Sequence, residues 1–468
     1  MLAFLDALDG WLYYPVLIIV LLAAGIFFSF KTGFVQFRLF GEAIRVISEK
    51  PQKGGMSSFK ALMVSTASRV GTGNIVGVAT AICLGGFGAA MWMWIIALIG
   101  MASAFVESTL AQIYKRRDKD GSSYGGPAYY IEDALHNRGL ACAFAFFLVI
   151  TYAFGFNLLC SYNIQDSFKA YGFYDPSVTP WIIGAVFAVI VFWCLIGGGK
   201  RVANVASSVV PVMGLIYVIV SLIIVFANIR LIPAVFAEIV RDAFNFKAIF
   251  GGVAGSCMTY GIKRGLYSNE AGVGSAPNAA AAADVSHPVK QGLVQMFSVF
   301  LDTIVICTAT ALMCMCSGVT PSADIAGVRY VQLAASTLFG SGFGTAFVTF
   351  SLILFGFTTL IGNLYYCDNA IAFLNRNKMP SKKTMLIFYI LDALVIFVGA
   401  GVSMSAAWAI ADITMAFMCF VNIPACVVLG KVAYKALDDY CRQKAEGRNP
   451  VFKAKNIGMD DAALDYWK

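Results

Sequence analysis

Charged residues are scarce in this chain of 468 residues. Asp, Glu, Lys and Arg together make up only 13% of it, whereas a soluble globular protein carries about one quarter. Hydrophobic residues reach 59%, and the mean hydropathy is +0.76. These values exclude a soluble globular protein, and we expect an all-α polytopic membrane protein.

Histidines are few, and no two cysteines have the CxxC spacing. The chain has two histidines, His136 and His287, and its twelve cysteines form no CxxC pair. A metal or redox centre therefore has no ligand set, and the cysteines are expected to be small apolar packing residues. We see no nucleophile with a base that would indicate an enzyme. The net charge of +8 is explained by membrane topology, and no motif indicates a nucleic-acid partner.

Apolar runs of about 17 to 25 residues, long enough to cross a bilayer, occur about eleven times. No small-residue cleavage site follows the first run, so we expect it to remain as a permanent helix. The runs are centred near Ile19, Gly71, Ile96, Phe154, Phe187, Leu215, Arg264, Thr303, Leu354, Ala393 and Phe417.

Lys and Arg fall mostly in alternate loops. One side of the membrane takes the bases of residues 31–60, 115–119, 200–201 and 376–383, together with those of the C-terminal tail. Because basic loops face the cytoplasm, we expect a multi-pass protein of the plasma membrane with its N-terminus outside and its C-terminus in the cytoplasm. The charged tail is expected to be partly frayed.

Two of the apolar runs are interrupted by glycine-rich polar segments. The first segment reads SRVGTGN from Ser68 to Asn74, and the second extends from Lys263 to Gly274. An opened helix leaves amides and carbonyls without partners, so in hydrocarbon it persists only where it is buried in protein or lines a polar cavity. Paired breaks in the two halves of a chain indicate the binding site of a transporter.

The positions of the breaks suggest an internal repeat. Without the first run about ten remain, and the broken ones are then the first run of each half. An odd number of helices per repeat makes the second repeat enter the membrane the opposite way up. We therefore expect one N-terminal helix and a five-plus-five inverted repeat. The expected divisions are an N-terminal helix and loop at 1–56, repeats at 57–228 and 247–430, an extracellular loop at 229–246 and a tail at 431–468.

The first break offers two kinds of ligand group. Opening the helix at residues 72–74 exposes amides at the start of the outer half-helix, whose positive dipole end attracts a carboxylate. The freed carbonyls of Ala67 to Val70 offer the hard oxygens that a small cation prefers. The alternative interpretation is a glycine kink at a tight helix crossing.

Further polar residues of the apolar runs have several candidate roles. Glu270 is expected to pair with a neighbouring base as a structural or gating pair, the alternative being that these groups face an aqueous vestibule. Thr358 and Thr359 either bond their own preceding turn or complete a cation cage beside the opened helix. The amide of Gln165 can accept from an ammonium group and donate to a carboxylate. The acids without an assigned role are Glu107, Asp302, Asp392 and Asp412.

Four motifs occur in order along the chain: VGTGNIVGVAT at 70–80, GGPAYY at 125–130, GIKRGLYSNEAGVGSAP at 261–277 and FTTLIG at 357–362. In these motifs the chain resembles the alanine/glycine:cation symporter family, the sodium:alanine symporters, whose fold is of the leucine-transporter type. The motifs cover most of the chain, and the third is very specific.

The resemblance implies that the chain imports a small neutral amino acid, alanine or glycine, with sodium by alternating access. A proton is the alternative to sodium as the coupled ion. The substrate carboxylate would meet the backbone of residues 72–74. The residues implied for the carboxylate are Thr72, Gly73 and Asn74. Those implied for the ammonium group and side chain of the substrate are Gln165, Tyr267, Asn269 and Thr359. Those implied for the ion are Ala67, Val70, Thr358 and Thr359.

One departure from the family pattern bears on the substrate. Many members carry tryptophan where this chain has Asn363, which follows Thr359 by one helical turn and shares its face. Asparagine vacates volume and adds an amide, so glutamine or another larger polar amino acid is the alternative main substrate. Tyr267, where phenylalanine is common, adds another polar group. A channel is the alternative of another class, although no filter motif indicates one. The sequence does not define the oligomeric state.

Overall fold

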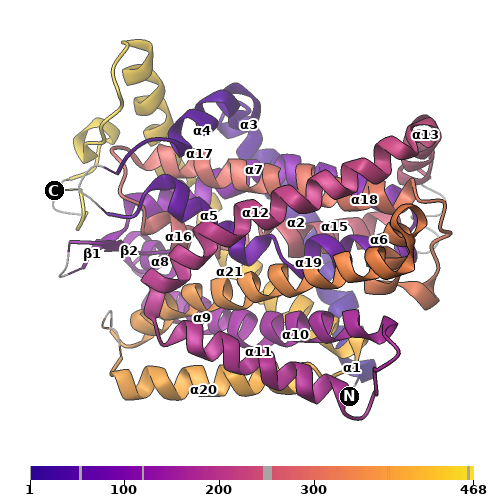
Figure 1. Ribbon diagram of the computed structural model, residues 1–468. Helices are drawn as coiled ribbons and strands as arrows, with labels where there is room; N and C mark the ends of the chain where they lie inside the picture. Colours follow the sequence, from indigo (N-terminus) through magenta and orange to yellow (C-terminus); the bar gives the residue numbers. More distant parts are fainter. Residues whose placement is uncertain are drawn as a thin grey trace.

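Helices carry nearly all of the secondary structure in the computed structural model (Figure 1). The structure describes residues 2–51, 55–118, 121–245, 256–376, 378, 380–460 and 464–467. Within these residues the only sheet is an antiparallel pair of two-residue strands, β1 (Arg116–Arg117) and β2 (Ser123–Tyr124). The predicted all-α fold class is therefore confirmed.

A helical stretch at the N-terminus precedes the first break. Two short helices follow it. The second of them buries Glu42, Ala43 and Val46 and packs against α17 (Pro288–Val299). The elements are α1 (Leu2–Trp11), η1 (Leu12–Leu17), α2 (Ile18–Lys31), α3 (Val35–Arg38) and α4 (Phe40–Ile47).

The first predicted repeat begins with a broken helix and ends with a long one. At the predicted extracellular loop, α13 turns Val235 and Ile239 inward, and Trp92 Nε1 donates to the carbonyl of Ala243 at 3.1 Å. The elements are α5 (Ser58–Arg69), η2 (Gly73–Gly77), α6 (Val78–Gly85), α7 (Gly88–Ile113), α8 (Pro127–Leu135), α9 (Arg138–Val149), η3 (Ile150–Phe156), α10 (Asn157–Asp166), η4 (Ser167–Ala170), α11 (Thr179–Leu195), α12 (Gly198–Ala227), η5 (Ile229–Leu231) and α13 (Ile232–Ala243).

The second predicted repeat also begins with a broken helix. Residues 246–255, which hold its predicted start, lie outside the described residues. Gly340 has φ 79° and ψ 158°, and it divides α19 into two helical parts. The elements are α15 (Cys257–Asn269), α16 (Ala276–Ala281), α17 (Pro288–Val299), η7 (Phe300–Cys307), α18 (Thr308–Met315), η8 (Ala323–Ile325), α19 (Val328–Leu374), α20 (Lys382–Gly399), α21 (Met404–Ala445) and η9 (Ala454–Ile457).

Length and composition identify six helices of the described residues that could each cross a membrane. The number is seven if the bent pair Ser58–Arg69 and Gly73–Gly85 is one span, and Ile18–Lys31 and Thr179–Leu195 are shorter apolar helices. The chain is thus a multi-pass membrane protein, while the total of about eleven spans stays a prediction. The six helices are Gly88–Ile113, Arg138–Ala170, Gly198–Ala227, Pro288–Met315, Val328–Leu374 and Met404–Ala445.

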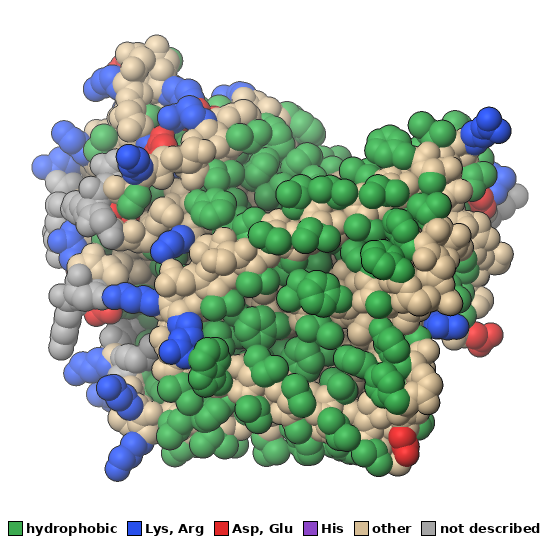
Figure 2. Space-filling model, in the orientation of Figure 1, with side chains coloured by type: hydrophobic (Ala, Val, Ile, Leu, Met, Phe, Trp, Pro, Cys, Tyr) green, Lys and Arg blue, Asp and Glu red, His purple; other side chains and the backbone are tan. Residues whose placement is uncertain are grey.

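The surface agrees with a membrane-embedded bundle. Apolar side chains cover the flank along which the long helices run, and Lys and Arg gather at the end that holds the C-terminus (Figure 2). The N-terminus lies near the other end of the long helices (Figure 1). This arrangement is the one expected for termini on opposite sides of a bilayer. Which end faces the cytoplasm stays a prediction from the loop charges.

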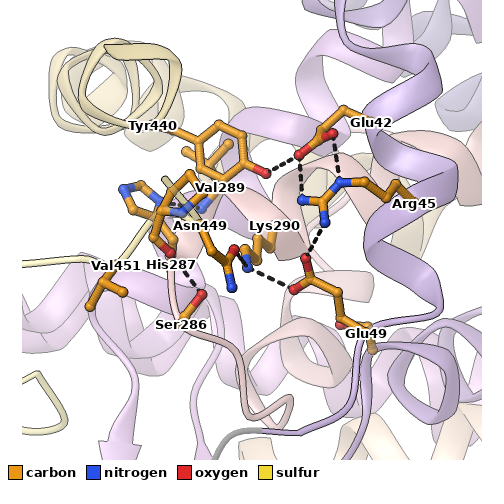
Figure 3. Close-up of polar contacts among 12 residues, drawn as sticks. Glu42, Arg45, Glu49, Ser286, His287, Val289, Lys290, Tyr440, Asn449 and Val451 are labelled. Carbon is orange, nitrogen blue, oxygen red and sulfur yellow. Dashed lines mark hydrogen bonds and ion pairs between the residues drawn. The ribbon is translucent and has the colours of Figure 1, made fainter. Parts of the chain in front are cut away.

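The C-terminal tail packs against the ends of other helices. Lys290, at the start of α17, donates to Glu49 at 2.7 Å and to Asn449 of the tail at 2.7 Å (Figure 3). Near the end of the chain, Trp467 Nε1 donates to the carbonyl of Gln112 in α7 at 2.8 Å. The expectation of a frayed tail is therefore wrong for its described residues, because they have partners far away in the sequence.

Candidate functional site

The first predicted break lies between α5 and η2. α5 ends at Arg69, η2 begins at Gly73, and the two halves are bent by 52°. A Cβ on Gly71 would lie 2.1 Å from Thr359 Oγ1, and one on Gly73 would lie 2.7 Å from the ring of Tyr267. Neither glycine has a positive φ. Close approach of neighbouring side chains, rather than an unusual backbone angle, therefore requires glycine at these positions.

The break releases carbonyl groups at the end of α5. In a continuous helix the amides of Gly71 and Asn74 would bond the carbonyls of Ala67 and Val70. Instead, the Gly71 amide donates to Asn74 Oδ1 at 2.8 Å, and the Asn74 amide donates to the Gly71 carbonyl at 3.3 Å. The oxygens of Ala67 and Val70, both predicted cation ligands, are thus freed from these helical bonds.

The two predicted threonine ligands lie differently. Thr359 Oγ1 donates to the carbonyl of Ser68 at 3.4 Å, so it reaches the end of α5. Thr358 Oγ1 bonds its own helix, with the carbonyls of Leu354 and Phe355 at 3.1 and 3.0 Å. Each hydroxyl oxygen keeps lone pairs for a cation, but only Thr359 contacts the break through a hydrogen bond.

Asp302 joins the first break to α15. Asn74 Nδ2 donates to Asp302 Oδ1 at 2.7 Å, and Ser268 Oγ donates to Asp302 Oδ2 at 2.7 Å. Thr303 Oγ1 donates to the same oxygen at 2.9 Å, and Asn269 Nδ2 donates to Thr303 Oγ1 at 3.3 Å. The side chain of Asn74 is therefore used to hold the two broken helices together.

The second break starts later than predicted, because α15 continues through Asn269. Residues 263–269 are helical, whereas the sequence predicts that they belong to the interruption. The chain then opens with positive φ angles of 52° at Glu270, 86° at Gly272 and 91° at Gly274. Glycine tolerates this region readily, whereas Glu270 is held there at a cost of about 1–2 kcal/mol.

Serine hydroxyls, rather than a base, bond Glu270. Ser275 Oγ donates to Glu270 Oε2 at 2.5 Å, and Ser68 Oγ donates to Oε1 at 3.3 Å. Among the described residues neither Lys263 nor Arg264 forms an ion pair with this carboxylate. The predicted pair of Glu270 with a neighbouring base is therefore wrong, since both bases have partners on other helices.

Those partners are acids of α1 and α21. Arg264 pairs with Asp412 at 2.5 Å, and Lys263 pairs with Asp9 at 2.5 Å. The guanidinium of Arg264 also lies 3.7 Å from the ring centre of Trp408. Burying a charge is costly unless it is paired, and these contacts tie α1, α15 and α21 together at one end of the site.

An aromatic layer lies between these ion pairs and the first break. The ring of Tyr267, which covers Gly73, is 4.7 Å from the ring of Phe156 and 4.9 Å from that of Trp408. Tyr267 is only 5% exposed. The layer separates the break from solvent on the side of Arg264.

Glu107 holds the second break from the side of α7. Its Oε1 accepts from the amide of Gly272 at 3.3 Å, and its Oε2 accepts from Asn422 Nδ2 at 2.8 Å. Asn422 Nδ2 also donates to the Gly272 carbonyl at 2.9 Å. Both polar groups of an opened peptide unit are thereby satisfied inside the protein, as burial demands.

Gln165 lies away from the first break. Its Oε1 accepts from the hydroxyl of Tyr174 at 2.9 Å, whereas Asn163 of the same helix donates from Nδ2 to Thr72 Oγ1 at 3.0 Å. The structure therefore brings Asn163 to the break and leaves the predicted Gln165 apart from it. The two residues are about 200° apart around the helix, and only its rotation decides which one faces the site.

The amide of Asn363 is bonded on both sides. Ser68 Oγ donates to its Oδ1 at 2.7 Å, and its Nδ2 donates to Asn157 Oδ1 at 2.8 Å. Asn157 Nδ2 in turn donates to Asp392 Oδ1 at 2.8 Å. Asn363 thus belongs to a buried network that links the end of α5 to α20. The sequence instead suggests that Asn363 leaves free volume in the pocket and offers its amide to the substrate.

Most of the predicted site residues lie at the first break or within one hydrogen bond of it. Asn269 is linked to the break through Thr303 and Asp302, whereas Gln165 and Thr358 bond elsewhere. All of these residues are buried. Sequence reasoning missed Ser68, Asn163 and Ser268, whose positions depend on contacts between distant segments. Exposed fractions are 0% for Thr72, Asn74, Asn269 and Asn363, 3% for Thr359 and 5% for Tyr267.

The model of one family matches nearly the whole chain. It is described as the sodium:alanine symporter family and covers residues 1–454. A protein of Bacillus subtilis named probable sodium/glutamine symporter GlnT is 43% identical, over 97% of this chain and 94% of its own length. Amino-acid carrier protein AlsT of the same organism is 42% identical over the same shares.

Two further similarities come from an archaeal relative and a solved structure. Sodium/alanine symporter AgcS of Methanococcus maripaludis is 35% identical, over 94% of this chain and 98% of its own length. The crystal structure of MhsT in complex with L-phenylalanine is 12% identical, covers 88% of this chain and 94% of that one, and has a TM-score of 0.49.

Proposed function

The chain belongs to the sodium:alanine symporter family and is a sodium-coupled amino-acid symporter, and we propose that it imports alanine or glycine by alternating access. Each sodium ion that moves inward across 100 mV releases about 2.3 kcal/mol for this uptake. A proton is the alternative coupled ion. The main support within the molecule is the opened turn between α5 and η2.

That turn can bind an ion and a zwitterion side by side. The carbonyls of Ala67 and Val70, with the hydroxyls of Thr358 and Thr359, are the oxygens proposed for sodium. The first amides of a helix have no preceding turn to bond, so those of Thr72 and Gly73, at the start of η2, suit the substrate carboxylate. Two ligands that stabilise one conformation raise each other's affinity, which makes substrate binding depend on sodium.

The burial of the site suits a closed intermediate of the transport cycle. The aromatic layer and the pair of Arg264 with Asp412 cover the break at one end. Opening that end requires Tyr267 and Trp408 to separate, whereas access from the other end requires movement of the helices around Ser68. We propose that the helices move as the two inverted repeats 57–228 and 247–430, with the binding turns at their interface.

Glutamine remains the alternative main substrate. The relative named as a probable glutamine symporter is 43% identical to this chain over 460 residues. A direct contact between Asn363 and the glutamine side chain is disfavoured, because both polar groups of Asn363 are already bonded, to Ser68 and Asn157. We therefore propose alanine or glycine as the main substrate.

The proposed setting is the plasma membrane, with the N-terminus outside. The loop charges support this orientation through the preference of Lys and Arg for the cytoplasm. The gathering of basic side chains at the end that holds the C-terminus supports it as well (Figure 2).

Uptake by proteoliposomes tests the proposal. Vesicles containing the full chain should accumulate labelled alanine or glycine with sodium outside and should not do so with choline. Equal uptake in both salts would reject sodium coupling, and an acid-outside gradient in choline tests the proton. Stronger competition by glutamine than by alanine and glycine would instead identify glutamine as the main substrate.

A further inference from the structure

Asn163 has a buried acceptor atom that the fold leaves unused. The side chain is fully buried, and its Nδ2 donates to Thr72 Oγ1 at 3.0 Å. Its Oδ1 has no hydrogen-bond partner among the described residues. A buried amide oxygen without a donor is costly, so such an atom at a binding site points to a ligand that supplies the donor.

The helix that carries Asn163 turns one face toward the opened turn. Phe156, Cys160 and Asn163 follow one another at spacings of four and three residues, which places them on one side of a helix. The ring of Phe156 lies 4.7 Å from that of Tyr267, and Cys160 lies next to Thr72. Asn163 is therefore part of the wall that α10 contributes to the site.

The bond to Thr72 fixes where the free oxygen lies. The nitrogen and oxygen of a side-chain amide are about 2.2 Å apart, so Oδ1 lies within about 5 Å of Thr72 Oγ1. Thr72 directly precedes η2, the helix at whose start the substrate carboxylate is proposed to bind. In an α-amino acid the ammonium and carboxylate groups are attached to the same carbon, so both can contact this end of the turn.

We propose that Oδ1 of Asn163 accepts a hydrogen bond from the ammonium group of the transported amino acid. This inference rests on the proposed function and adds a recognition residue to it. An amide oxygen attracts N–H donors and offers nothing to a carboxylate, so the contact is selective for the amino group. Because every α-amino acid carries that group, Asn163 serves recognition of the class and does not separate alanine from glutamine.

Calorimetric binding to the full chain in lipid nanodiscs, with saturating sodium, tests the contact. Asn163→Leu removes both polar atoms at similar size and should weaken glycine, alanine and glutamine alike, by about tenfold or more, as expected for a bond to a charged group. Asn163→Asp keeps an acceptor and should bind all three within about threefold of the original chain.

A matched control comes from the same helix. Ser161 bonds the carbonyl of Ile396 at 2.5 Å and lies about 200° around the helix from Asn163. Ser161→Ala should leave the affinity for glycine and alanine unchanged. If Asn163→Leu is not recovered as folded protein, Asn163→Ser replaces it. The serine side chain is shorter than that of asparagine, so its hydroxyl does not reach the position of the amide oxygen.

Several outcomes would overturn the inference. Affinity within threefold of the original in Asn163→Leu would show that no contact exists. A loss confined to glutamine would place Asn163 against the substrate side chain, and an equal loss in Asn163→Asp would show that the amide donates. If the unsubstituted chain binds none of the three amino acids with sodium, the proposed function fails instead.

Discussion

Gly71 and Thr359 approach so closely that a methyl group on the glycine would lie 2.1 Å from the threonine hydroxyl oxygen. One belongs to the first break and the other to α19, so the contact joins the two halves of the chain at the proposed ion site. No side chain can be added on the glycine without moving one of these segments.

Gly71→Ala is therefore expected to reduce sodium-dependent uptake to less than about one tenth, because overpacking of this size costs about 1–3 kcal/mol and displaces the proposed ligand Thr359. Uptake at several sodium concentrations measures the effect. Gly214→Ala is the control, since its added methyl group would lie 3.9 Å from the nearest atom, in Ile306. Equal uptake in both variants would contradict the assignment of the ion site.

Asp412→Asn is expected to destabilise the protein by about 3–5 kcal/mol, because it leaves the buried guanidinium of Arg264 without its acidic partner. The thermal unfolding midpoint of the purified protein measures this effect. Glu238→Gln removes an exposed partner of Arg241 and should change stability by no more than about 1 kcal/mol. Similar midpoints for the two variants would show that the buried ion pair contributes no more to stability than the exposed one.

Asn363→Leu is expected to lower uptake of alanine and glutamine by the same factor. The change leaves Asn157 Oδ1 without its donor and removes the shorter of the two bonds that Ser68 donates, at a cost of about 1–3 kcal/mol. Competition between the two amino acids measures the ratio directly. Asn375→Ala, at an exposed amide, is the control. A selective loss of glutamine would instead assign Asn363 to the substrate pocket.

His287 should make stability depend on pH. Burial lowers the pKa of His287 below 6.5, although Asp439 at 3.4 Å opposes this shift. The unfolded chain then takes up a proton at a higher pH than the folded one, so stability is full above about pH 6.5 and falls as the pH drops below it. The difference between thermal midpoints at about pH 7.5 and about pH 5.5 should shrink in His287→Gln. An unchanged difference would assign the dependence to other groups.

The first break could be predicted from the sequence, whereas the start of the second could not. At the first, glycines and polar residues interrupt an apolar run, and the helix breaks at that point. At the second, Lys263 and Arg264 suggested an interruption because charges are costly in hydrocarbon. They remain helical because Asp9 and Asp412 pair with them, and neither acid is near them in the sequence.

The site on α10 shows a second limit of sequence reasoning. Asn163 and Gln165 have equally polar amides, and the choice between them depends on the rotation of the helix about its axis. That rotation is set by packing, including the contact of Phe156 with Tyr267. Membrane helices lack the polar outer face that fixes rotation in soluble proteins, so hydropathy could not provide it.

The link between Asp9 and Lys263 has a consequence for hybrid proteins. A chimera that receives its first helix from another symporter inherits whatever residue stands in place of Asp9, while Lys263 stays behind. Lys263 would then lose the nearer of its two acidic partners and keep only Asp412, at 3.4 Å. Grafts of the leading helix therefore need the residue at 263 to be exchanged as well.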